Sequence, residues 1–246
     1  MLLAISVGAF VSFVVTSSVC IGMLILKSRK AAAQRWVLLN FSVAIWSLAE
    51  IFIINGIANA FTLFMWALGF FIPVTYLDFA NELSDRRTII KWIVGFGYVA
   101  SVLLLILSFY GPVGHFRSHH IMQYTWGPGT AYFFFVLMLI IFPVIGIWEL
   151  NHKRGTPKTS ILLRNQLNYV ILASIVGFPS GFTEILAYYG IISLPVGWFS
   201  LWLYPLIITY AILRHRLMDI SVVIRKSLVY LRLTPLSRPF LPKVKT

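Results

Sequence analysis

The sequence has few charged residues and almost no cysteine. Of its 246 residues, 11% are charged and 59% are hydrophobic, and Cys20 is the single cysteine. One cysteine cannot form an intramolecular disulfide, so the sequence does not indicate a redox compartment. In soluble globular domains, about a quarter of all residues are charged. The composition therefore excludes an ordinary water-soluble domain and favours an integral membrane domain.

Motifs for catalysis and nucleotide binding are absent. The sequence contains no H-E-x-x-H, no G-x-S-x-G and no phosphate-binding loop. Acidic residues are scarce as well, with 7 Asp and Glu against 20 Lys and Arg, which gives a net charge of +13. No segment outside the apolar runs is long enough to fold into a basic nucleic-acid-binding surface. We therefore expect no enzyme activity, no cofactor, no metal and no nucleic acid.

Seven apolar runs are long enough, or nearly so, to cross a bilayer, which takes about 20 helical residues. They predict an all-α bundle of seven transmembrane helices. Asn55, Gly56 and Asn59 supply the turn between the second and third runs, which must fold back on each other. The expected spans are Leu2–Leu26, Trp36–Ile54, Phe61–Ala80, Ile90–Tyr110, Thr130–Glu149, Leu167–Tyr189 and Val196–Leu213.

The positive charges predict the orientation of this bundle. Seven crossings place every Lys and Arg except Arg117 on one side of the membrane. Short loops rich in Lys and Arg remain cytoplasmic. We therefore expect the N-terminus outside and the C-terminus inside, with attraction between the basic loops and the lipid bilayer.

Four prolines fall inside different spans: Pro73, Pro143, Pro179 and Pro205. Each removes a backbone hydrogen bond and bends a helix unless its neighbours compensate. Gly177 and Gly181 flank Pro179 in a G-x-x-x-G pattern that permits close helix approach. Two interpretations stay open, namely packing kinks or hinges that move in function.

The two ends of the chain resemble each other. Glu50-Ile51-x4-Gly56-Ile57 matches Glu184-Ile185-x4-Gly190-Ile191, and Trp66-x6-Pro73 matches Trp198-x6-Pro205, in the same order. Spans one to three and five to seven also share a direction, as a parallel 3+1+3 internal repeat requires. Chance identity in a biased composition is the alternative.

Glu50 and Glu184 are the clearest candidates for function, because an ionisable group inside a span is costly and usually faces the bundle interior. Each lies on a polar helical stripe that we expect to point inward. Apart from Lys91 at the very start of the fourth span, no Lys or Arg lies within a span to neutralise them, so burial favours the neutral acids. Glu50 and Glu184 either form hydrogen bonds that hold helices together or line a pocket that binds a proton, a cation or an amine. The two stripes are Asn40, Ser47 and Glu50, and Ser174, Gly177, Gly181, Glu184 and Tyr188.

The segment Gly111–Gly129 is the longest expected loop on the outer side. It contains His119, His120 and Trp126. Adjacent histidines without an accompanying Cys or acid are a poor metal site. The interpretations left open are a lid over an outer cavity with proton-sensing histidines and an interfacial loop anchored by Trp126.

The chain leaves the membrane through residues 214–231, where Leu217, Ile220 and Ile224 lie along an apolar seam beside Asp219. Such a segment either couples the bundle to a following module or lies on the inner leaflet. Residues 232–246, rich in proline and basic residues, are expected to be disordered. The domains are then 1–213, 214–231 and 232–246.

Two stretches resemble the N-terminal seven-helix sensor region of bacterial membrane histidine kinases. They are Tyr210-Ala211-Ile212-Leu213-Arg214-His215-Arg216-Leu217-Met218-Asp219-Ile220, which continues to Tyr230, and Tyr124-x-Trp126-Gly127-Pro128-Gly129. Similar regions precede diguanylate cyclases. The resemblance implies a sensor in a prokaryotic inner membrane. It would couple an outer stimulus, either a small ligand or a proton, to a cytoplasmic transmitter module in cis or in trans. Whether the chain forms a homodimer stays open. Nothing after Tyr230 resembles a transmitter.

Two other functions stay open. A small-solute transporter built from two three-helix repeats would explain the symmetric acids. A scaffold that only anchors a partner would make both acids dispensable. Hinges at Pro179 and Pro205, with Gly177 and Gly181, belong to the sensor hypothesis, in which they move the exit helix.

Overall fold

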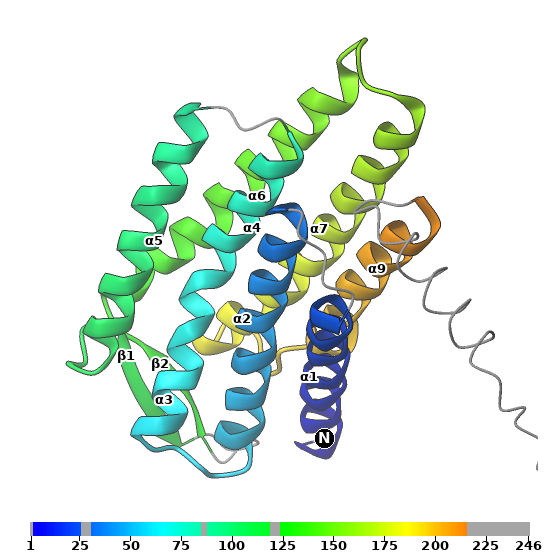
Figure 1. Cartoon of the computed structure of the whole chain (residues 1–246). Coiled ribbons are helices and arrows are strands. Elements are labelled where there is room, and N and C mark those ends of the chain that lie inside the picture. The colour runs from blue at the N-terminus through cyan, green and yellow to red at the C-terminus, as the bar shows by residue number, and fades with distance from the viewer. Residues whose placement is uncertain (1, 26–30, 85–87, 119–123, 216–246) are drawn as a thin grey trace, which may run out of the picture.

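The computed structural model of this chain describes residues 2–25, 31–84, 88–118 and 124–215. These residues form a bundle of seven helical rods with one β-hairpin (Figure 1). The elements are α1 (Leu2–Ile25), α2 (Ala31–Ile54), α3 (Ala60–Ala67), the 3₁₀ helix η1 (Leu68–Phe71), α4 (Ile72–Leu83), α5 (Thr88–Ser108), β1 (Gly114–Ser118), β2 (Tyr124–Pro128), α6 (Tyr132–Gly155), α7 (Ile161–Tyr188), α8 (Trp198–Leu201) and α9 (Leu203–His215).

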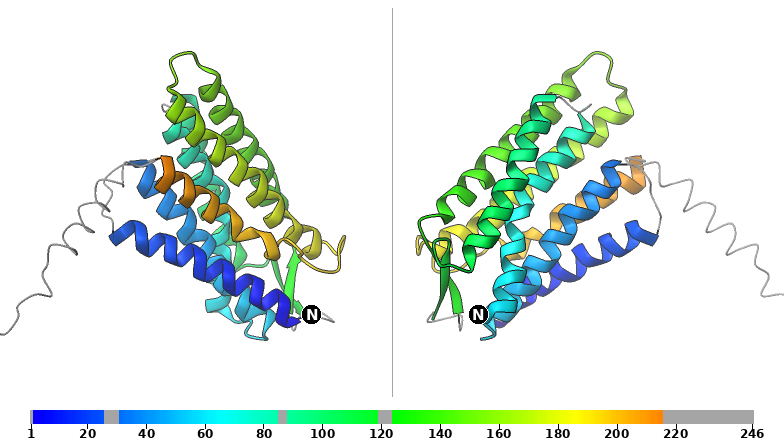
Figure 2. Two further views of the ribbon diagram at one scale, coloured as in Figure 1. Left: turned by 90° about the vertical axis from the view of Figure 1, so that its right-hand side faces the viewer. Right: turned by 60° about the vertical axis from the view of Figure 1, so that its left-hand side comes forward.

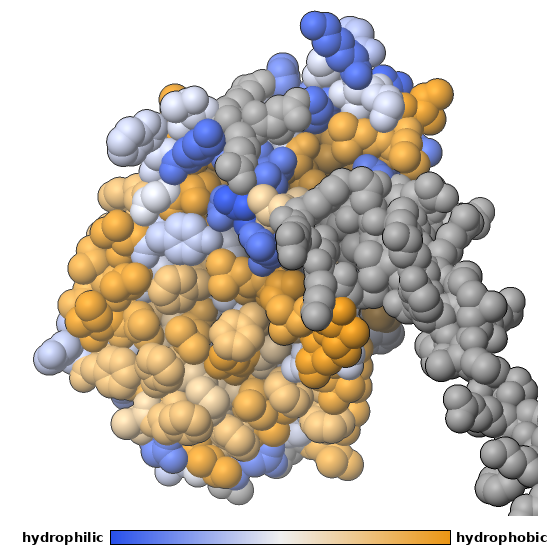
Figure 3. All heavy atoms as spheres, viewed as in Figure 1, coloured by the Kyte–Doolittle hydropathy of each residue, from blue (hydrophilic) through white to orange (hydrophobic). Residues whose placement is uncertain are grey.

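The seven rods run close to the expected spans, and six of them have the length and hydropathy to cross a membrane. Their outward side chains are large and apolar. Trp92 is 78% exposed, Phe96 72% and Leu3 77%, values that would be costly in water. Hydrophobic residues cover the middle of the face shown in Figure 3, and hydrophilic ones gather toward its upper end. The chain is therefore a multi-pass membrane protein whose surface suits a lipid bilayer.

Six rods form a ring, and α5 lies outside it. Neighbours around the ring are α1, α2, α3 with α4, α6, α7, and α8 with α9, which returns to α1. Helix α5 packs against α3, η1, α4 and α6 and turns its other side outward (Figures 1 and 2). Two clusters of buried apolar side chains meet at α2 and α4, one among the ring helices and the other extending to α5 and the hairpin.

Glycines allow several of these close contacts. A Cβ atom added at Gly97 of α5 would lie 2.5 Å from the ring of Phe142, and one at Gly146 of α6 would lie 2.5 Å from the ring of Tyr76. Small residues at such positions let membrane helices approach closely, where dispersion contacts replace the hydrophobic effect. The GxxxG glycine Gly177 has the same role, because its added Cβ would lie 3.0 Å from Tyr204 Cβ of α9.

The third and seventh rods are broken, where continuous helices were expected. The third changes from α3 through η1 to α4 at Leu68–Phe71, and the seventh is interrupted at Trp202 between α8 and α9. Pro73 and Pro205 each fall in the first turn after the break, where a missing N–H is tolerated. These two prolines therefore begin helices, whereas Pro143 and Pro179 lie inside α6 and α7.

The turn between α2 and α3 forms as predicted. Helix α2 ends at Ile54, and Gly56 follows with a positive φ of 94°, which costs glycine little. Asn59 caps α3, its side chain accepting a hydrogen bond from Thr62 N at 2.9 Å.

The segment expected as a loop contains an antiparallel hairpin, with Phe116 opposite Trp126. Gly114 has a φ of 151°, and a Cβ atom there would lie 2.4 Å from Gly127 O. The strands are short, and alternation within five residues is too brief to separate them from a loop by sequence.

The two ends of the bundle differ in charge. The hairpin end is formed by the turn 55–59, the hairpin and the turn 189–197, and Arg117 is its only described Lys or Arg. The basic end is formed by the residues around Lys153, Lys158 and Arg164. There Arg35 pairs with Asp78 at 2.7 Å and with Glu82 at 3.0 Å. Asp78 and Glu82 thus have a cationic partner at the basic end.

Candidate functional site

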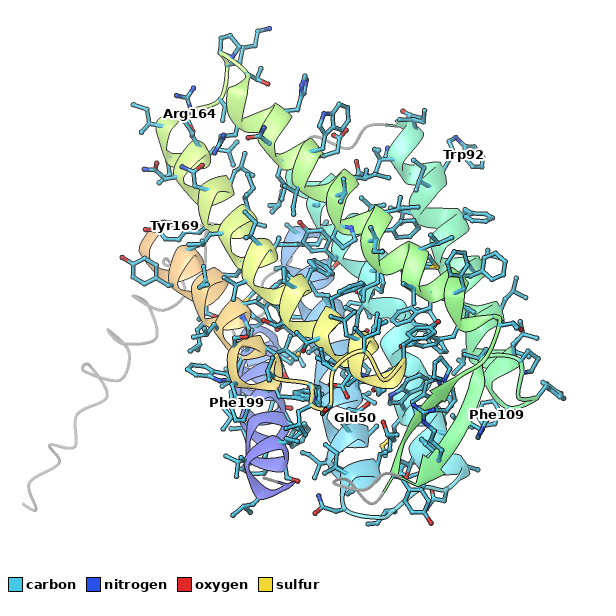
Figure 4. All side chains as sticks on the ribbon, turned by 180° about the vertical axis from the view of Figure 1, so that it is seen from behind. Glu50, Trp92, Phe109, Arg164, Tyr169 and Phe199 are labelled. Atoms are coloured by element: carbon cyan, nitrogen blue, oxygen red, sulfur yellow. The ribbon has the colours of Figure 1, made fainter. Side chains whose placement is uncertain are left out.

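Glu50 lies one turn before the end of α2, inside the bundle near the hairpin (Figure 4). It is 2% exposed. Its Oε1 atom accepts hydrogen bonds from Tyr188 Oη at 2.5 Å and from Trp66 Nε1 at 2.7 Å. Trp66 Nε1 also approaches Tyr188 Oη at 3.2 Å. Residues from α2, α3 and α7 are thereby joined around a single carboxyl oxygen.

Glu184 lies one turn before the end of α7 and is 3% exposed. It lies near enough to Glu50 for their charges to interact, with Tyr188 and Trp198 beside it. Tyr188 has one hydroxyl proton, and the short contact to Glu50 uses it. The Trp198 Nε1 atom makes no well-formed hydrogen bond to any described residue. Among the described residues, the hydrogen bonds that Tyr188 and Trp198 offer to Glu184 are less well formed than those that Glu50 accepts.

The hairpin covers this pair of acids. The Trp126 ring stacks on that of Trp66 with centroids 4.1 Å apart, and Trp126 is completely buried. Arg117 Nη2 donates to Tyr188 O at 2.7 Å, which attaches β1 to the end of α7. The Tyr132 ring fills the space between Trp66 and Tyr188, with centroids 6.1 and 6.3 Å away. The site is therefore closed toward the hairpin end by aromatic rings.

A cavity of about 80 Å³ extends from this site into the bundle. The predicted stripe of α7 lines it completely, from Tyr188 and Glu184 through Gly181 and Gly177 to Ser174. The inward direction of both polar stripes is confirmed, since Asn40 and Ser47 on α2 are fully buried as well. The other walls come from the elements α2, α3 to α4, α6, α8 and α9, and include Leu39, Val43, Trp46, Trp66, Phe70, Tyr76, Tyr132, Phe135, Leu201, Tyr204 and Ile208.

Two polar contacts cross the bundle farther from the hairpin. Ser174 Oγ of α7 donates to Tyr76 Oη at 2.8 Å, and Tyr204 Oη of α9 donates to Asn40 Oδ1 at 3.2 Å. Both phenols line the cavity. Buried hydroxyls need such partners, because lipid and apolar side chains offer none. These contacts fix the positions of α4 and α9 relative to α7 and α2.

The remaining predicted residues lie in different surroundings. Ser47 donates to Ser12 Oγ of α1 at 3.3 Å. Pro179 is exposed on α7, and nothing lies within 4 Å of a Cβ atom added at Gly181. Pro205 begins α9. The other candidates fall outside the described residues, namely His119, His120, Leu217, Asp219, Ile220 and Ile224.

Sequence reasoning gave no role to Trp66 beyond the repeat, and none to Tyr132, Tyr76 or Tyr204. Their roles come from contacts between residues far apart in the chain, such as Trp66 with Tyr188. The sequence held one signal for Trp66, because the pattern Trp66-x6-Pro73 recurs as Trp198-x6-Pro205, and Trp198 lies beside Glu184. Tyrosines in apolar spans carry no comparable pattern, since many lie at the interface.

A scan against models of known protein families finds no match to this chain, and a search of curated proteins finds no significant relative.

Proposed function

We propose that this chain is a membrane sensor module in which a stimulus at Glu50 and Glu184 alters the last helix. One observation carries the proposal. The cavity that begins at Glu184 and Tyr188 is lined at its other side by Leu201 of α8 and by Tyr204 and Ile208 of α9. Any occupant, or any change in the acids that reshapes the cavity, therefore contacts the helix that leads to the C-terminal segment.

The charge distribution supports the orientation that goes with this proposal. In it the basic end faces the cytoplasm and the hairpin end faces outward. In this proposal the membrane is the inner membrane of a prokaryote, because the sequence resembles the sensor regions of bacterial histidine kinases. The exit segment, including Leu217, Asp219, Ile220 and Ile224, passes the change to a transmitter module in cis or in trans, in a monomer or a homodimer.

The parallel repeat belongs to the proposal, and matched backbone bonds support it. Helices α2 and α7 end with the same pattern, four residues after an acid, and the glycine that follows each has a positive φ. The matching bonds are Asn55 N to Ile51 O with Tyr189 N to Ile185 O, Gly56 N to Ile53 O with Gly190 N to Ala187 O, and Ile57 N to Phe52 O with Ile191 N to Leu186 O.

Side chains follow the same correspondence. Asn40 and Ser174 occupy equivalent positions, and each bonds to a tyrosine of the opposite three-helix unit. The repeat also matches Arg35 with Tyr169 and Asp78 with Tyr210. Arg35 pairs with Asp78, and the rings of Tyr169 and Tyr210 pack against each other. The ring of six rods, with α5 outside, also has the neighbours that a two-fold axis along its centre requires.

Two bundle states with different cavities are needed for signalling, and the stimulus must bind them unequally. The breaks at η1 and Trp202 supply places where α4 and α9 can turn relative to α3 and α8. Near Pro179, Gly177 lets α9 pack closely on α7, and nothing lies within 4 Å of a Cβ atom added at Gly181. In this proposal the hinge residues Pro179 and Pro205 act at these points.

A transporter is the second candidate, and the repeat favours it. Parallel repeats place a substrate site on the axis between the two units. Glu50 and Glu184, which match in the repeat, lie near enough for their charges to interact, as such a site would require. A transporter would carry a solute to both ends. A sensor needs only the movement of α9.

Electron paramagnetic resonance distances in nanodiscs would test the sensor proposal. Spin labels at Asn151 of α6 and Tyr210 of α9, both exposed, report on the basic end, after Cys20 is replaced by Ala. We expect the label distance to change when the pH falls from mildly alkaline to acidic values. A Glu50→Gln/Glu184→Gln variant should abolish the change.

The matched control is Glu149→Gln, a buried acid of α6 that lies near the basic end. It should keep the response. A distance that stays constant with pH and with ligand contradicts the sensor. Solute uptake by vesicles that contain the chain cut after His215 supports the transporter instead.

A further inference from the structure

The two buried acids differ in how fully their oxygens are bonded. Glu50 receives hydrogen bonds from Tyr188 and Trp66. Glu184 occupies the equivalent place, but the Tyr188 proton is taken by Glu50, and Trp198 Nε1 makes no well-formed bond to a described residue. A buried acceptor without donors is costly, as is a buried donor without an acceptor. Among the described residues, the Glu184 carboxyl is held by less well-formed bonds than that of Glu50, which leaves acceptor positions for a further donor group.

The charge of this region is unbalanced within the described residues. No Lys, Arg or His contributes to the charge environment of Glu184 or Glu50. The nearest basic side chain in the hairpin, Arg117, donates to Tyr188 O. At the basic end, by contrast, Arg35 pairs with two acids. Two carboxyl groups that share a site cannot both ionise without a cation between them.

The walls of the cavity suit an apolar body attached to such a cation. Aromatic rings of Trp66, Phe70, Tyr132 and Tyr188 surround the end near Glu184, and aliphatic side chains continue toward α9. Ring faces attract ammonium groups that have lost their water. Its volume of about 80 Å³ accommodates on the order of five to eight water-sized groups, at roughly 10–15 Å³ each.

We infer that Glu184 binds the ammonium group of a small apolar amine, whose hydrocarbon part lies in the cavity between α7 and α9. The inference rests on the proposed function and names the ligand class for its site. The ammonium donates to the Glu184 carboxylate, with Trp198 and Tyr188 beside it. The tail contacts Tyr204 and Ile208, so the amine touches the last helix directly.

Tryptophan fluorescence of the whole chain in nanodiscs measures this binding, since Trp66 lines the cavity and Trp198 lies beside Glu184. The probe is n-pentylamine, and pentan-1-ol is its neutral counterpart of equal size. We expect saturable quenching by the amine, and affinity at least tenfold weaker for the alcohol. Glu184→Gln should weaken amine binding at least tenfold, and Glu149→Gln, the matched buried acid, should leave it unchanged.

Equal affinity for the amine and the alcohol overturns the inference, because the cavity then recognises only apolar volume. Full amine affinity in a folded Glu184→Gln variant overturns it as well. If that variant does not fold, the comparison of amine with alcohol on the unchanged chain still decides. Amine binding without movement of α9 contradicts the proposed function alone, whereas a pH-driven movement without amine binding contradicts this inference alone.

Discussion

Replacing Tyr188 by Phe tests how the site is held together. The change removes one oxygen from a side chain that is 2% exposed and leaves its ring in place. It deletes the 2.5 Å bond to Glu50 and the 3.2 Å contact with Trp66. A hydrogen bond to a charged group contributes about 1.5–3 kcal/mol in soluble proteins. Interhelical hydrogen bonds within membranes average about 0.6 kcal/mol and reach about 1.7.

We therefore expect Tyr188→Phe to lower the free energy of unfolding by about 1–2 kcal/mol. The control is Tyr189→Phe, the next residue, which is 46% exposed and, unlike Tyr188, does not donate to Glu50 Oε1. It should change stability by less than about 0.5 kcal/mol, as surface substitutions usually do. Reversible unfolding in mixed micelles, followed by circular dichroism, gives both values.

A double-mutant cycle with Glu50→Met isolates the interaction. Methionine removes the acceptor that Tyr188 Oη and Trp66 Nε1 share, so Tyr188 loses its bond to Glu50 and Trp66 keeps only the 3.2 Å contact with Tyr188 Oη. Tyr188→Phe should then cost much less, because it removes a donor that is already unsatisfied. The reasoning is refuted if Tyr188→Phe costs the same in both backgrounds, or if it matches Tyr189→Phe in the unchanged chain.

Two further predictions concern the glycines and the hairpin. Gly197→Ala should lower the free energy of unfolding by at least about 3 kcal/mol or prevent folding, because the added Cβ atom would overlap Ser180 O. Gly181→Ala should cost less than about 0.5 kcal/mol, because nothing lies within 4 Å of a Cβ atom at that position. Thermal unfolding compares the two, and equal losses would contradict the close approach. Arg117→Ala should raise amide hydrogen exchange in Tyr124–Pro128 about tenfold, as the hairpin loses its bond to Tyr188 O. Unchanged exchange would show that Trp126 alone holds the hairpin.

The apolar runs and the inward stripes followed from sequence, for a common physical reason. Lipid forces backbone groups to bond within each helix, so hydropathy alone predicts the spans. A buried polar group must face protein, so spacing alone predicted that Glu50 and Glu184 lie inside. The turn at Gly56 and the cap at Asn59 are local features, which a few residues encode.

The pairings between distant segments were decided by tertiary structure. Sequence placed Glu50 and Glu184 at similar positions, but only packing decided that Tyr188 would bond to Glu50 and leave Glu184 with less well-formed bonds. The breaks at η1 and Trp202, the hairpin and the cavity beside α9 depend in the same way on contacts across the bundle. Hydropathy measures the transfer of one segment into lipid. Which rings and hydroxyls meet depends on how seven segments fill a shared volume, and no single segment contains that information.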